Sequence, residues 1–168
     1  MINIVMYEPE IPANTGNIMR SVAGVDAKLH LIKPLGFSLE DKYIKRCGAG
    51  YIDKCNYTVY ENYEDFKSKN KGTYYFLTRY GNKRYTDFDY SDSTENIYFI
   101  FGRESSGIPL DILKENFEHC LRIPTNDKIR ALNVSNSVAI MLFEALRQQN
   151  FDGLIDYDVF KGKDYIIK

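Results

Sequence analysis

Cysteine and histidine are scarce in this sequence. Its 168 residues include three cysteines, Cys47, Cys55 and Cys120, and two histidines, His30 and His119. An odd number of widely spaced cysteines predicts reduced thiols in a cytoplasm rather than a disulfide framework. There is no Cys-x-x-Cys pair, so we expect no zinc site and no other metal. Neither histidine lies in a motif typical of a Cys–His nucleophile.

Long apolar runs are also missing. No stretch approaches the ~20 apolar residues that span a bilayer, and no basic segment of the signal-peptide type precedes the apolar start at Ile2–Met6. At ~100–200 residues per domain, the length predicts one domain that can fold without disulfide or metal staples. We therefore expect a cytoplasmic protein with no membrane partner.

The net charge is close to zero, at −1. A domain that binds nucleic acid is usually basic, so this value by itself disfavours such a partner. The charges are unevenly distributed, however. Residues 1–84 carry 13 Lys and Arg against 9 Asp and Glu, whereas residues 85–168 carry 9 against 14. This asymmetry permits a basic face, and it stays open whether one is formed by Lys42, Lys45, Arg46, Arg79, Lys83 and Arg84.

Short apolar runs alternate with helical patterns, which is typical of an α/β fold with a mostly parallel sheet and helices on both faces. The runs predict strands at Ile2–Met6, Lys28–Ile32, Tyr57–Tyr60, Thr73–Thr78, Ile97–Phe101 and Leu121–Ile123. The patterns predict helices at Thr15–Val22, Leu39–Arg46, Glu64–Lys69, Ile108–Phe117 and Val134–Gln148.

Capping residues support several of these helices. Asn14 and Ser38 can each accept a hydrogen bond from a free N–H at the start of the following helix, and Glu40 and Asp41 suit a first turn. Pro109 also suits a first turn, because its missing N–H has no helical partner there. The last helix is predicted to face the core or a dimer partner with one apolar stripe: Val134, Val138, Met141, Leu142, Ala145 and Leu146.

Two glycine-rich loops exclude common nucleotide-binding classes. Gly48-Ala49-Gly50 lacks the third glycine and the preceding strand of a dinucleotide-binding fingerprint. The loop Gly102–Gly107 is not followed by the Lys-Ser/Thr of a Walker A loop. An unrelated nucleotide-binding oxidoreductase is therefore disfavoured.

Three other loops can carry chemistry. The first contains Asn14-x-Gly16-x-x-x-Arg20. The second reads Phe101-Gly102-Arg103-Glu104-Ser105-Ser106-Gly107, in which two glycines permit close backbone approach to a ligand. The third reads Arg130-Ala131-Leu132-Asn133-Val134-Ser135-Asn136 and offers donors at a helix start. Taken singly, each is better explained as a capped helix or a tight turn.

Together, and in this order, the three loops resemble the motifs of the SPOUT superfamily of methyltransferases. The sequence is most similar to the single-domain tRNA (cytidine(34)-2′-O)-methyltransferases. That similarity is carried by Asn3-Ile4-Val5-Met6-Tyr7-Glu8-Pro9-Glu10-Ile11-Pro12, by Pro34-x-Gly36-Phe37 and by Arg122-Ile123-Pro124. It covers residues 1–154, expected to be a single domain, and leaves 155–168 as a C-terminal tail.

The resemblance implies a SPOUT fold whose C-terminal part forms a deep trefoil knot, and a homodimer whose catalytic pocket combines both chains. It implies S-adenosylmethionine as cofactor and tRNA as partner. The implied reaction methylates the ribose 2′-oxygen of the wobble nucleotide 34, cytidine or a modified uridine, in leucine tRNAs. Carried over position by position, the cofactor contacts are Leu77, Gly102, Ile123, Ala131 and Leu132.

The catalytic residues implied in the same way are Asn14, Arg20, Glu104, Asn133 and Ser135. We expect Arg20 to hydrogen-bond the 2′-oxygen or the adjacent phosphate, because a guanidinium stays protonated and is a poor base. Asn133 and Ser135 are expected to shape the pocket and hold substrate phosphate. Glu104 is expected to order the cofactor loop rather than take a proton.

The sequence departs from its relatives at a few motif positions. Arg103 stands where relatives often have Pro, Ser105-Ser106 where they often have Thr-Arg, and Ala131 where they often have Ser. These departures leave open an alternative, a catalytically silent RNA-binding dimer of the same fold. Affinity for S-adenosylmethionine distinguishes the two, since a silent relative need not keep it.

Overall fold

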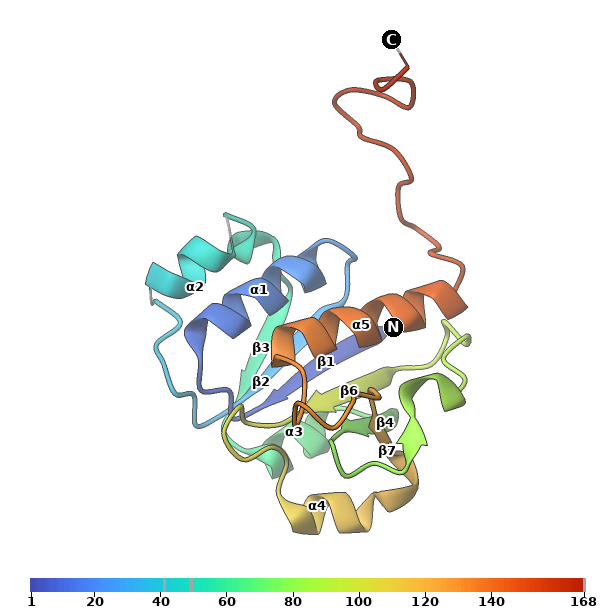
Figure 1. Ribbon diagram of the computed structural model, residues 1–168. Coiled ribbons are helices and arrows are strands. Elements are labelled where there is room, and N and C mark those ends of the chain that lie inside the picture. Colours follow the sequence, from blue (N-terminus) through green and yellow to red (C-terminus); the bar gives the residue numbers. More distant parts are fainter. Residues whose placement is uncertain (41, 49, 168) are drawn as a thin grey trace.

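The computed structural model describes residues 1–40, 42–48 and 50–167, and a seven-stranded sheet forms its centre (Figure 1). Every strand pair in the sheet is parallel, and the strand order is β3-β2-β1-β6-β4-β7-β5. The strands are β1 (Ile2–Tyr7), β2 (Lys28–Ile32), β3 (Tyr57–Tyr60), β4 (Thr73–Leu77), β5 (Lys83–Arg84), β6 (Ile97–Phe101) and β7 (Cys120–Arg122).

Helices cover both faces of the sheet, as predicted. They are α1 (Pro12–Ala23), α2 (Lys42–Cys47), α3 (Tyr63–Lys69), α4 (Leu110–Glu115) and α5 (Val134–Gln148). In Figure 1, α1, α2 and α5 lie on one face, and α3 and α4 lie on the other. Short 3-10 turns occupy Ile52–Lys54, Tyr85–Asp87 and Phe117–His119.

Two apolar clusters, one on each face, result from the alternation of side chains along the strands. In β1, Ile4 and Met6 join the cluster beneath α1 and α5, whereas Val5 and Tyr7 join the cluster beneath α3 and α4. All six residues of β1 are buried, and five of them are apolar, as is typical of a parallel strand that is covered on both faces.

The predicted apolar stripe of α5 faces the core. Val138, Met141, Leu142, Ala145 and Leu146 are buried, and the helix packs against α1, β1 and β6. Phe143, which lies off the stripe, keeps 49% of its surface exposed.

Several predicted helix starts were wrong. Asn14 does not cap α1: the helix begins at Pro12, and Ile11 is the residue before its first turn. Pro12 can open the helix because its fixed φ suits the first turn. Ser38 accepts from the N–H of Glu40 in a turn, and α2 begins only at Lys42. Asp41, expected in that first turn, lies outside the described residues, as does Ala49 of the glycine-rich loop.

The predicted helix at Ile108–Phe117 is shorter than expected. Pro109 has an extended backbone (φ −52°, ψ 140°), so α4 starts one residue later, at Leu110. Asn116 interrupts the helical conformation before a 3-10 turn. The strand β5 was missed altogether, because its two residues, Lys83 and Arg84, are charged and pair only with β7 at the sheet edge.

The segment after α5 leaves the rest of the fold (Figure 1). Residues 155–167 are exposed, and Phe160 and Ile166 each keep 94% of their surface accessible. In the part of the chain that the structure describes, no helix combines the length and apolar character needed to cross a bilayer. No cluster of three or more potential metal ligands occurs among the same residues.

A buried polar network surrounds His30 in β2. Its Nε2 lies 3.0 Å from Asn3 Oδ1, and its Nδ1 lies 2.8 Å from the Tyr60 hydroxyl. The Asn3 amide nitrogen donates to the carbonyls of Met1 and Ile97, so Asn3 Oδ1 must accept. His30 therefore carries its proton on Nε2, and its neutral Nδ1 shares the single hydroxyl proton of Tyr60 with Asn70 Oδ1, which lies 3.4 Å from that hydroxyl. Burial lowers the pKa of His30 to about 3.

We predict that His30 makes the protein less stable as the pH falls below about 6.5. The unfolded chain takes up a proton near pH 6.5, whereas the native ring stays neutral until about pH 3. The contribution of neutral His30 to the free energy of unfolding is thus present in full above pH 6.5. About 2 kcal/mol of it is lost by pH 5. Urea unfolding of the wild type and H30Q between pH 5 and 8 measures the difference in slope. H119Q is the control, since His119 is exposed, and identical slopes for H30Q and the wild type would contradict the prediction.

Candidate active site

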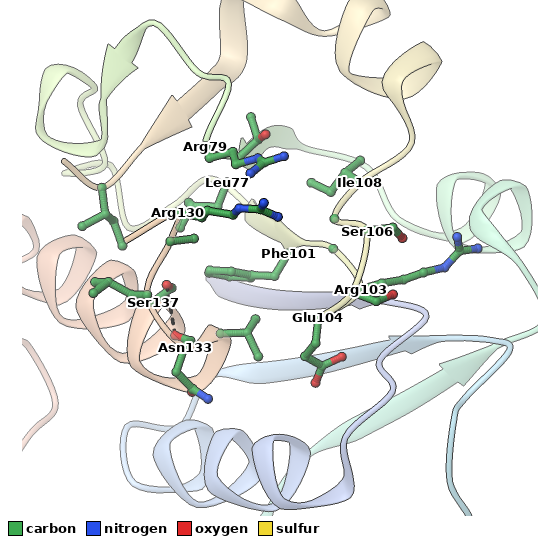
Figure 2. A pocket seen from close by; sticks show the side chains of 18 of the residues that line it. Leu77, Arg79, Phe101, Arg103, Glu104, Ser106, Ile108, Arg130, Asn133 and Ser137 are labelled. Carbon is green, nitrogen blue, oxygen red and sulfur yellow. Dashed lines mark hydrogen bonds between the residues drawn. The ribbon is translucent and has the colours of Figure 1, made fainter. Parts of the chain in front are cut away.

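A pocket of about 440 Å³ opens at the carboxyl ends of β4, β6 and β7 (Figure 2). Ligands of open parallel sheets bind at this edge, and the volume lies in the range of ~300–1,000 Å³ typical of small-molecule and cofactor sites. Its walls come from four segments that are distant in the sequence: the β1–α1 loop, the residues after β4, the β6–α4 loop, and the stretch from β7 to the start of α5.

All five residues expected to contact a cofactor line this pocket: Leu77, Gly102, Ile123, Ala131 and Leu132. Leu77 ends β4, Gly102 follows β6 and Ile123 follows β7, so three neighbouring strand ends contribute one residue each. Ala131 and Leu132 approach from the segment before α5. Phe101 and Ile108 extend the apolar part of the lining, and polar residues, among them four arginines, make up much of the rest.

Gly102 is required where the β6–α4 loop folds back on itself. Arg103 and Gly107 exchange two backbone hydrogen bonds, and Gly107 has φ +75°. A Cβ atom on Gly102 would lie 2.1 Å from the carbonyl carbon of Gly107 and 2.3 Å from the nitrogen of Ile108. Both contacts are with backbone, so the loop cannot close around any larger residue.

A chain of hydrogen bonds joins four of the five predicted catalytic residues and links all three motifs. Asn14 Nδ2 donates to Glu104 Oε1 at 3.0 Å, and Asn133 Nδ2 donates to Asn14 Oδ1 at 3.0 Å. Asn133 Oδ1 in turn accepts from the backbone N–H and the hydroxyl of Ser135. Because a carboxylate only accepts, Glu104 sets the orientation of the Asn14 amide, and Asn14 sets that of Asn133.

Glu104 binds the backbone that leads into α1. Its carboxylate accepts from the backbone N–H of Glu10 at 2.8 Å and of Ile11 at 3.3 Å. A negative charge at this place also opposes the positive end of the helix dipole. Asn14 was predicted as the cap of α1 because its side-chain type suits one, but its amide instead donates to Glu104, 90 residues away in the sequence.

Two further contacts hold the β1–α1 loop against the β6–α4 loop. Glu10 accepts from the N–H and hydroxyl of Ser105, both at 2.8 Å, and these bonds lower the pKa of Glu10. Arg103 is ion-paired with Glu8 and lies over the ring of Tyr7. The residue that departs from relatives, Arg103, is thus engaged in closing the two loops.

Arg20 and Ser135 are not among the residues that line the pocket. Ser135 is attached to it through Asn133. Arg20 lies in the last turn of α1, exposed, with its guanidinium carbon 5.5 Å from the centre of the Tyr51 ring. The structure therefore does not bring Arg20 to the pocket of its own chain.

Several pocket residues were not assigned to the site from the sequence, although Arg122 and Arg130 belong to its motifs and Arg79 was considered for a basic face. They are Thr78, Arg79 and Tyr80 after β4, Arg122 in β7, and Arg130 before Ala131. The predicted strand Thr73–Thr78 is followed directly by Arg79 and Tyr80, and the third motif begins at Arg130. Their positions in the sequence could therefore have pointed to the pocket.

The basic residues considered for one face are divided between the sheet edges. Arg79, Lys83 and Arg84 lie near β5 at one edge of the sheet. Lys42 and Arg46 belong to α2, which packs on α1 above the other half of the sheet. The side chain of Lys45 lies outside the described residues.

The chain matches the model of the SpoU rRNA methylase family over residues 1–143. It therefore belongs to this family, and it is a methyltransferase, as the three motifs predicted. A protein of Listeria monocytogenes carries the provisional name tRNA (cytidine(34)-2′-O)-methyltransferase. It is 51% identical to this chain over 154 residues, which are 91% of each chain. A tRNA (cytidine(34)-2′-O)-methyltransferase of Methylovorus glucosotrophus is 44% identical over 92% of this chain and 100% of its own length.

Solved structures agree with the fold. One solved structure is described as giving insight into the 2′-OH methylation of C/U34 on tRNA. It superimposes on this chain with a TM-score of 0.83 at 31% identity, over 90% of this chain and 97% of the other. The SpoU methyltransferase AviRb of Streptomyces viridochromogenes, solved with AdoMet, superimposes with a TM-score of 0.78 over 89% of this chain and 60% of the other. At 19% identity, the second likeness concerns the fold alone.

Proposed function

We propose that this chain methylates the ribose 2′-oxygen of the wobble nucleotide of tRNA, cytidine 34 or a modified uridine, with leucine tRNAs as substrates. The observation that carries the proposal is the pocket, in which the three methyltransferase motifs meet through the chain Ser135–Asn133–Asn14–Glu104. The relatives named for 2′-O-methylation of cytidine 34 in tRNA match over most of both chains, and they support that part of the proposal.

The methyl donor is S-adenosylmethionine, and the residues of the pocket suit it. Apolar side chains such as Leu77 and Leu132 can enclose the adenosyl group, while the backbone beside Gly102 and Ile123 can hydrogen-bond its polar edge. When bound, the cofactor supplies a methyl group on a sulfonium that is already activated for in-line transfer. With Ala131 in place of Ser, a backbone contact to the cofactor is kept and a hydroxyl contact is lost.

The task of the protein is then to position the ribose and stabilise the developing alkoxide. Arg20 hydrogen-bonds the 2′-oxygen or the adjacent phosphate, and the proton leaves to phosphate or water. Asn133 and Ser135 hold substrate phosphate at the start of α5, where free N–H groups favour an anion. Glu104 keeps the β1–α1 and β6–α4 loops together, so its part in the reaction is positioning.

The enzyme acts as a homodimer, because Arg20 does not reach the pocket of its own chain and must be supplied by a partner. Ile11 and Phe143, on the side of α1 and α5, keep 44% and 49% of their surfaces exposed, as residues of an interface would in a single chain. The chain threads a deep trefoil knot between β7 and α5. This is supported by the path of the segment, which crosses from the β4–β7–β5 side of the sheet to α1 (Figure 1).

Residues 1–154 form the cytoplasmic methyltransferase domain, and 155–168 form a tail outside it. The proposal is tested by mapping 2′-O-methyl groups in total tRNA from cells that lack the protein. We expect the wobble methyl group to disappear from leucine tRNAs and to return when the wild-type chain is supplied. An unchanged wobble nucleotide would rule out this substrate.

A further inference from the structure

The turn that follows β4 presents an arginine and a tyrosine at the mouth of the pocket. The N–H of Tyr80 and the N–H of Gly81 bond to the hydroxyl and carbonyl of Thr78, each at 3.2 Å, and the N–H of Thr78 bonds to the carbonyl of Leu121. A Cβ on Gly81 would lie 2.7 Å from the backbone of Leu121. The turn therefore rests directly on β7, which holds Arg79 and Tyr80 in place.

Tyr80 is unusually exposed for a residue in such an ordered turn. It keeps 62% of its surface accessible although it lines the pocket. The Arg79 guanidinium donates to the Tyr80 hydroxyl, and its central carbon lies 4.7 Å from the ring centre. The planar cation thus lies over one face of the Tyr80 ring, which leaves the other face for a stacked partner.

Arg79 and Arg130 differ from other basic residues in and near the pocket in their partners. Lys83, Arg84 and Arg103 are ion-paired with Glu118, Asp87 and Glu8. Within residues 1–40, 42–48 and 50–167, no carboxylate pairs with Arg79 or Arg130. In Figure 2, the side chains of both extend across the pocket toward Ile108 and Ser106. The mouth of the pocket is therefore left with positive charge, which suits an anion.

We propose that Tyr80 stacks on the base next to the methylated nucleotide and that Arg79 and Arg130 bind the phosphate between the two. Proteins recognise single-stranded RNA by aromatic stacking and by arginine contacts to phosphate, and an anticodon loop offers both groups. The inference rests on the proposed function, since it requires an RNA substrate at this pocket. The anion that the arginines attract could also be the carboxylate of the cofactor, and the experiment separates the two.

The test compares Y80A and Y80F with the wild type, using an anticodon stem-loop RNA that carries 2-aminopurine on either side of the target nucleotide. Stacking on Tyr80 should quench the probe on one side, and Y80F should keep the quenching because it keeps the ring. For Y80A we expect lost quenching and a KM for RNA raised about 10-fold, with kcat nearly unchanged. Y57A is the matched control, because Tyr57 is an exposed tyrosine in β3, the strand at the opposite edge of the sheet.

The arginines are tested with R79Q and R130Q. We expect each to raise the KM for RNA while calorimetry shows unchanged affinity for S-adenosylmethionine. Weaker cofactor binding with unchanged KM for RNA assigns the arginines to the cofactor and overturns their part of the proposal. Unchanged quenching and KM in Y80A overturn the stacking. If the wild type methylates no RNA, the proposed function fails, whereas an active wild type with wild-type-like variants defeats this inference alone.

Discussion

Replacing Gly102 with alanine is expected to abolish cofactor binding. The new methyl group would lie 2.1 Å from the backbone of Gly107, so the β6–α4 loop must open. That loop forms one wall of the pocket and carries Glu104, which holds the β1–α1 loop and Asn14. A displacement near 1 Å at such a site costs ~100-fold in rate, and we expect kcat/KM to fall by at least about that factor.

Calorimetry with S-adenosylmethionine and urea unfolding measure the effect of G102A on binding and on stability. G24A is the control, because Gly24 has an ordinary helical φ of −70° and a Cβ there would be 3.5 Å from its neighbours. We expect G24A to bind the cofactor like the wild type. Wild-type affinity in G102A would show that the loop can close around a side chain, and would refute the geometric argument.

Replacing Arg20 with alanine is expected to abolish methyl transfer but, unlike G102A, to leave cofactor binding intact. Arg20 does not line the pocket, and its guanidinium lies against Tyr51 on the surface of α1. Its removal should therefore leave the affinity measured by calorimetry unchanged, while methyl transfer to tRNA falls below detection. Equal loss of both would contradict the assignment of Arg20 to the substrate.

Mixing the two inactive variants tests whether Arg20 acts on the pocket of a partner. In a dimer of one R20A chain and one G102A chain, the intact pocket of the first faces the intact arginine of the second. Because a two-fold dimer has two equivalent sites, about one site in two should then work, and mixing should restore activity. If Arg20 serves its own chain, every pocket in the mixed dimer carries one defect and no activity returns.

Much of the fold could be predicted because its signals are local. The strands Lys28–Ile32 and Ile97–Phe101 and the helix Val134–Gln148 were predicted with their correct bounds. Each has a run or stripe of apolar side chains that must be buried, and burial is the main driving force for such elements. The strand β5 has no such run, so its pairing depends on β7 and is not visible in the sequence.

In the candidate site, the difference between what local sequence shows and what depends on tertiary contacts is larger. The sequence by itself determined the family, through three short motifs, and part of the pocket lining, namely the five residues expected to contact the cofactor. Only the tertiary structure decided what those residues do for one another. Glu104, not Asn14, serves the start of α1, Arg103 is ion-paired with Glu8, and Arg79 and Tyr80 lie at the pocket mouth. The physical reason is that hydrogen bonds and ion pairs depend on distance in space, and here they join residues about 90 positions apart in the chain.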